Sequence, residues 1–115
     1  MKYFLTCFII LFFINFSAIA SKHSSLIEDL PLTNTMQEVA EDFVAFEKPS
    51  GRIMQLTVIT TESNKEILSF YNKSLHQLGW HKKGQNSFAR DNEVMLIEID
   101  KRSKNNYVTF TITSN

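Results

Sequence analysis

Alternation between apolar and polar side chains constrains the fold of this 115-residue chain more than any other feature of its sequence. The clearest example is segment 107–113, in which Val108, Phe110 and Ile112 are separated by threonines. Successive side chains of a β-strand point to opposite faces of a sheet. The pattern therefore predicts a strand with its apolar side chains in a core and its threonines on a more polar face.

A β-hairpin is expected over residues 43–60. Segment 43–47 is followed by a turn that contains Pro49 and Gly51, and then by the alternating segment 52–60. Proline suits the second position of a tight turn, where φ is near −65°, and glycine suits its end. In segment 52–60 Met54, Leu56 and Val58 alternate with Gln55 and Thr57, which assigns one face to the core and the other to a more polar surrounding.

One amphipathic helix is expected after the hairpin. Ser63 and Glu66 have the spacing of a capping box, in which each side chain satisfies a backbone N–H of the first turn. Gly79 is expected to end the helix in a left-handed conformation, with Trp80 packed back on the last turn. An apolar stripe is predicted along one side of this helix, formed by Ile67, Leu68, Phe70, Tyr71, Leu75 and Leu78.

Further strands are predicted after the helix, over residues 80–83, 87–90, 93–100 and 107–113, with a polar loop over residues 101–106. The resulting order is β-β-α-β-β-β-β. The expected fold is therefore α+β, with an antiparallel sheet of about five to six strands and one main helix packed on one face.

The N-terminus has the outline of a secretory signal peptide. Lys2 precedes an apolar run over residues 3–16, and Ala18 and Ala20 occupy the small-residue positions that a signal peptidase needs. The run is shorter than the roughly 20 apolar residues of a membrane span. We expect cleavage after Ala20 and a periplasmic or secreted protein. The alternative is an uncleaved segment and a membrane-anchored accessory protein.

These assignments divide the chain into a signal peptide at 1–20, a partly ordered leader at 21–42 and a single α+β domain at 43–115. Pro31 prevents one continuous helix in the leader. The leader carries several apolar side chains, which favour its lying across the domain over a free linker.

The composition excludes several kinds of chemistry. The only cysteine, Cys7, lies in the N-terminal apolar run, so the rest of the chain has no disulfide, catalytic thiolate or cysteine-ligated metal. Twelve basic and twelve acidic residues balance and are dispersed, which does not favour nucleic-acid binding. With three glycines in the whole chain, a glycine-rich phosphate loop is not expected. No cofactor is expected.

The motif FYNKSLHQLGW at the helix end, preceded by a P-x-G-R-I hairpin, resembles a family of small exported bacterial proteins, chiefly alphaproteobacterial. The resemblance covers the chain from about Leu30 to its end, and it implies a periplasmic location and a shared fold. The family has no assigned activity, so no catalytic residue is transferred. The resemblance is carried by Pro49, Gly51, Arg52, Ile53, Phe70, Tyr71, Leu75, Leu78, Gly79 and Trp80.

An enzymatic function has few candidate residues. A hydrolase-like or metal-dependent enzyme would use His76 and His81 together with a carboxylate, because both histidines flank the helix end. Glu98 and Asp100 share one face of a strand, but a solvent-facing strand has the same pattern. No spacing matches a reaction class. We therefore expect a protein without enzymatic activity and keep the enzyme as the alternative.

A binding function is favoured by an uncovered sheet face. A helix of about sixteen residues covers three or four strands, fewer than the sheet is expected to have. The uncovered face would bind an envelope protein, unless it meets only water or is covered by the leader. Segment 43–46 is a candidate edge strand for pairing with a partner or a second copy. The expected surface consists of Gln55, Thr57, Leu96, Glu98, Tyr107, Thr109 and Thr111.

Overall fold

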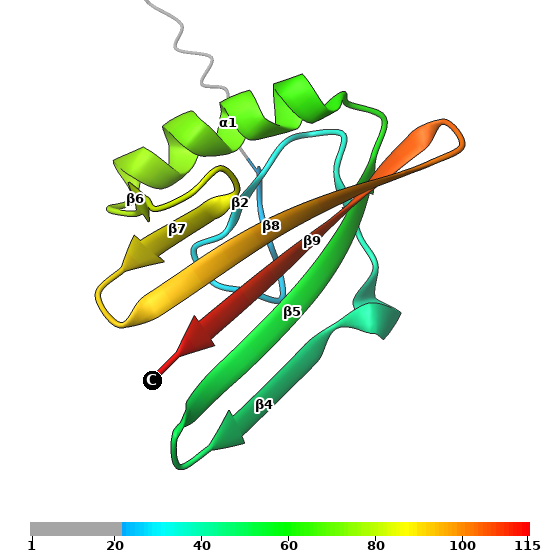
Figure 1. Ribbon diagram of the computed structural model, residues 1–115. Helices are drawn as coiled ribbons and strands as arrows, with labels where there is room; N and C mark the ends of the chain where they lie inside the picture. Colours follow the sequence, from blue (N-terminus) through cyan, green and yellow to red (C-terminus); the bar gives the residue numbers. More distant parts are fainter. Residues whose placement is uncertain (1–21) are drawn as a thin grey trace, which may run out of the picture.

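The computed structural model describes residues 22–115, so the expected signal peptide and its cleavage site lie outside the described range. The fold is α+β, with a seven-stranded antiparallel sheet and one helix between β5 (Gly51–Thr60) and β6 (His81–Lys82) (Figure 1). This confirms the predicted fold class. The elements of the predicted order are β4 (Val44–Lys48), β5 (Gly51–Thr60), α1 (Asn64–Gln77), β6 (His81–Lys82), β7 (Ser87–Arg90), β8 (Glu93–Arg102) and β9 (Asn105–Ser114).

The seventh strand of the sheet comes from the leader. It is β3 (Gln37–Glu38), which pairs with the end of β5 and is followed by a short 3₁₀ helix, η2 (Ala40–Asp42). Farther toward the N-terminus, β1 (Lys22–His23) and β2 (Pro31–Leu32) form a separate two-stranded ladder. The sheet order is β3-β5-β9-β8-β7-β6, and β4 pairs with the other half of β5 on the same edge as β3.

One face of the sheet carries the hydrophobic core, and both α1 and the leader pack against it. Tyr71 of α1 is fully buried, and its hydroxyl donates to the carbonyl of Pro31 at 2.6 Å. The leader thus fills the part of this face that one helix leaves uncovered. The buried apolar residues include Ile27, Leu30, Leu32 and Met36 from the leader, Ile67, Tyr71 and Leu75 from α1, and Leu56, Val58, Met95, Ile97, Val108, Phe110 and Ile112 from the long strands.

Local signals set both ends of α1. The Ser63 and Glu66 side chains each accept the backbone N–H of the other residue, at 3.1 and 2.9 Å, so the predicted capping box is present. At the other end Gly79 has φ +91°, and the N–H of Trp80 donates to the carbonyl of Leu75 at 3.0 Å. This is the Schellman arrangement expected from a glycine at that position.

The hairpin between β8 and β9 differs from the sequence prediction. We expected a polar loop over residues 101–106, but β8 extends to Arg102, β9 begins at Asn105, and Ser103 and Lys104 alone form the turn. Ser103 adopts φ +62° in this turn. The ladder continues beyond the core with polar side chains, because its backbone hydrogen bonds do not depend on burial.

The hairpin between β4 and β5 lies against the end of β9. Gly51 has φ +151°, and a Cβ atom built at this position would lie 2.0 Å from the carbonyl oxygen of Ser114. Glycine is therefore required there by a close backbone approach as well as by the turn. The approach holds β4 alongside the end of the long strands.

Candidate functional site

The face of the sheet opposite α1, which we name the open face, contains the whole surface expected from the sequence. Gln55 pairs with Thr111, and Thr111 pairs with Leu96, which places these side chains in one row across three strands. A second row joins Thr57, Thr109 and Glu98. Paired residues share a face and residues two apart along a strand share a face. Tyr107, two residues before Thr109, therefore lies on the open face with the other six.

Neither the helix nor the leader covers this face. The buried leader side chains belong to the same core cluster as those of α1, on the opposite side of the sheet. On the open face Thr57 and Thr109 are half-buried and their hydroxyls lie 3.2 Å apart, while Leu96 and Glu98 are exposed. The side chains of the open face are therefore accessible to a partner.

An apolar band crosses one end of the open face. Among residues 22–115, the large apolar side chains that are exposed number five, and strand pairing puts all of them on this face. Their exposed fractions range from 36% to 51%, which is far from burial in the core. The apolar band consists of Val44, Phe46, Ile53, Val94 and Leu96.

Strand register holds the apolar band together. Phe46 pairs with Ile53, Ile53 with Thr113, and Thr113 with Val94, so one row spans four strands. The adjacent row runs from Val44 through Gln55 to Leu96. The sequence prediction included Leu96 but missed the other four members. Period two along β5 and β8 was the available signal, since Ile53 and Val94 each precede a methionine, Met54 and Met95, that faces the core.

The opposite end of the open face is polar. The Arg102 Nε donates to the Asp100 carboxylate at 2.9 Å, and the guanidinium carbon lies 4.3 Å from the centroid of the Tyr107 ring. The hydrogen bond to Asp100 raises the pKa of Arg102, which stays charged. Along the strand direction, the open face thus has an apolar end at the β4–β5 hairpin and a charged end at the β8–β9 turn.

The predicted edge strand is present with shifted bounds. We expected residues 43–46, whereas β4 runs from Val44 to Lys48 and pairs with β5 on one side. All five of its residues are exposed. No other strand of the described chain pairs with its outer edge, so β4 could extend a partner's sheet.

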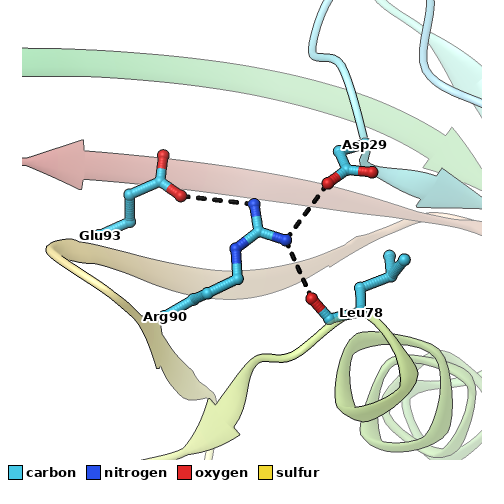
Figure 2. A network of polar contacts seen from close by, with 4 residues as sticks. All are labelled: Asp29, Leu78, Arg90 and Glu93. Carbon is cyan, nitrogen blue, oxygen red and sulfur yellow. Dashed lines mark hydrogen bonds and ion pairs between the residues drawn. The ribbon is translucent and has the colours of Figure 1, made fainter.

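A polar cleft of about 600 Å³ lies on the helix side, between the leader loop 26–30 and the ends of the long strands. Figure 2 shows the arginine at its wall: Arg90 donates to the Asp29 carboxylate at 3.2 Å, to the Leu78 carbonyl at 3.0 Å and to Glu93 at 3.4 Å. Its guanidinium also lies 4.4 Å from the Trp80 ring centroid. Arg90 is therefore occupied by the protein's own groups and connects three elements.

The histidines of the enzyme alternative are both exposed, His76 on α1 and His81 on β6. Within residues 22–115, no group of three or more histidine, cysteine, aspartate or glutamate side chains is arranged to hold a metal ion. In the same range no helix has both the length and the apolar character needed to cross a membrane. By strand pairing His81 shares the open face with Ala89 and Val94, whereas His76 lies on α1.

Register and burial thus single out the open face as an accessible surface with an apolar band at one end and a charged end at the other. Comparisons with protein-family models, with curated proteins and with solved structures found no match to this chain.

Proposed function

We propose that the chain is a small exported binding or accessory module without enzymatic activity, and that it acts by associating with a protein through the open face. The observation that carries the proposal is the gathering of all five exposed large apolar side chains of residues 22–115 on one sheet face. Contiguous apolar patches on soluble domains mark interaction sites more often than isolated apolar residues do.

The surroundings of the apolar band support protein contact. Gln55, Thr111 and Thr113 lie between the apolar side chains of the band, and charged groups lie farther along the face. Protein interfaces combine apolar and polar groups in this way. Export is proposed from the N-terminal 20 residues, in agreement with the resemblance to small exported bacterial proteins.

Site-specific photo-crosslinking in cells that produce the full chain tests this function. A photoreactive amino acid at Leu96 is expected to give a discrete covalent adduct with a protein, because Leu96 belongs to the apolar band. The matched control carries the same amino acid at Asn72, which is exposed on α1. Equal adducts at both positions, or none at Leu96, would contradict association through the open face.

A further inference from the structure

We infer that the open face binds a second copy of the same chain, forming a two-fold symmetric sandwich of two sheets. This inference rests on the proposed function, since it names the partner of the same face. It follows from the area of the face, from the position of the apolar band along it, and from the sizes and charges of the side chains that a two-fold axis would bring together.

The area of the open face is close to what a stable dimer requires. Strands β5, β8 and β9 have ten residues each, and β4 and β7 add five and four. With strand spacings of about 4.8 Å and rises of about 3.3 Å per residue, the projected area is roughly 600 Å². The relief of the side chains increases this area toward the ~800 Å² per partner of a typical specific interface.

The division of the face into apolar and charged ends selects the direction of the axis. A two-fold axis perpendicular to the strands would place the apolar band of one copy over Glu98 and Asp100 of the other, which would desolvate carboxylates against apolar groups. An axis parallel to the strands and above β9 instead places the apolar band over its own copy. It sets β5 over β8, and β4 over β7, of the second chain.

With this axis, Phe46, the largest side chain of the apolar band, faces a small one, whereas the two Tyr107 rings of β9 face each other near the axis. Phe46 of β4 lies over Ala89 of β7 in the second copy, because both belong to the row that contains Thr113. Ile53 correspondingly lies over Val94. Aligned sheets pack about 10 Å apart with interdigitated side chains. A protruding phenylalanine opposite an alanine fits that packing.

The charges are compatible with the same arrangement. Glu98 of one copy lies over Thr57 of the other, whose hydroxyl is able to donate a hydrogen bond to the carboxylate. Asp100 is the one carboxylate that this axis places over an apolar side chain, Ile59, and it remains paired with Arg102. No two carboxylates of the described open face are placed in opposition. The two Arg102 guanidiniums approach each other near the axis, because each is stacked on Tyr107 of β9, and each stays paired with Asp100.

The first test is the molar mass of the purified protein by light scattering and by analytical ultracentrifugation. We expect a dimer, and a monomer for Val94→Asp and Ile53→Asp, because these two residues face each other across the interface and a carboxylate at either position would be buried against an apolar side chain. Asn72→Asp on α1 adds the same charge outside the face and should remain a dimer. Circular dichroism of each variant checks folding. A wild-type monomer, or a dimer that both face variants leave intact, would overturn the inference.

The second test locates the axis. In a Cys7→Ser background, Thr111→Cys places one thiol of each copy next to the axis, and a short bismaleimide should join the two. A direct disulfide is not expected, since facing sheets lie about 10 Å apart and disulfides need Cα atoms within about 7 Å. Ser87→Cys, two strands from the axis, should give no covalent dimer. Equal crosslinking at both positions would contradict the proposed symmetry.

The two proposals fail in different ways. If the purified protein is monomeric but the Leu96 photo-adduct in cells contains a different protein, the self-association is wrong and the binding function stands. If Leu96 gives no adduct and the purified protein is monomeric, both are wrong. An adduct between two copies of this chain, together with the Thr111 crosslink, supports both.

Discussion

Glu38 shows how one carboxylate holds the leader in its folded shape. The hydroxyls of Ser24 and Ser25 donate to it, as does the backbone N–H of Ser25 at 3.2 Å. Partial burial by itself would raise the pKa of Glu38, but these hydrogen bonds outweigh burial and lower the pKa below its ordinary value. The loop between β1 and β3 is therefore closed by an ionised side chain.

The lowered pKa of Glu38 predicts a pH dependence of folding. The unfolded chain binds a proton at this carboxylate at a higher pH than the folded chain does, so the stabilisation is present above the ordinary pKa and is lost as pH falls through the lowered one. In denaturant titrations between about pH 5 and pH 3, the free energy of unfolding should fall more steeply for the wild type than for Glu38→Gln. Glu47→Gln, at an exposed residue of β4, is the control. Equal slopes for Glu38→Gln and wild type would refute this assignment.

At the scale of elements, Arg90 joins parts of the chain that are distant in sequence. Its guanidinium contacts Asp29 in the leader loop and the carbonyl of Leu78 at the end of α1, and it reaches Glu93 across the β7–β8 turn (Figure 2). The Arg90 side chain is 23% exposed. Partly buried charge-assisted bonds of this kind contribute more than exposed ion pairs.

Arg90→Lys should therefore lower the stability of the protein, by about 1–2 kcal/mol, because an ammonium cannot direct bonds to all three acceptors as a planar guanidinium does. Amide hydrogen exchange should accelerate in the leader loop 24–30, which loses its anchor. Arg102→Lys is the matched control, since that arginine and Asp100 are 61% and 64% exposed and no measurable change is expected. Equal effects of the two variants would show that the network of Arg90 does not fasten the loop.

The sequence was sufficient for elements whose signals are local. The capping box at Ser63 and the glycine at position 79 marked the ends of α1, and period two identified the long strands. β3 has only two residues, which are too few to show an alternating pattern. It is a strand because it pairs with β5. The ends of β8 and β9 were missed because their outer residues are polar on both faces, so their alternation carries no signal.

The open face was predictable only in part, for a related reason. Alternation assigns residues to one of two faces, and the seven expected residues share a face in the structure. Alternation alone does not tell which strands lie side by side, so the grouping of Phe46 with Ile53 and Val94 needed the register. The apolar character of these residues also made them resemble core positions, although the core lies on the opposite face.

At the scale of the whole molecule, the leader and the helix together close one core. Leu32 and Met36 are fully buried, and the sulfur of Met36 lies 3.3 Å from the Tyr71 hydroxyl. One fourteen-residue helix cannot cover a sheet of this width, so the leader supplies the remaining apolar cover. Because the leader is used on the helix side, it leaves the open face uncovered.

This division of the molecule predicts that the leader is essential for stability. Leu32→Ala should lower the free energy of unfolding by about 2–5 kcal/mol, as expected for a large-to-small change in a packed core. Leu26→Ala, at a half-buried leader position, should cost clearly less. Chemical denaturation followed by circular dichroism measures both. A small domain has a total stability of about 5–15 kcal/mol, so the loss at Leu32 would be a large part of it. If the leader only rested on the surface, Leu32→Ala would hardly change the free energy of unfolding. A negligible effect of Leu32→Ala would therefore separate the leader from the core and would make it available to cover the open face.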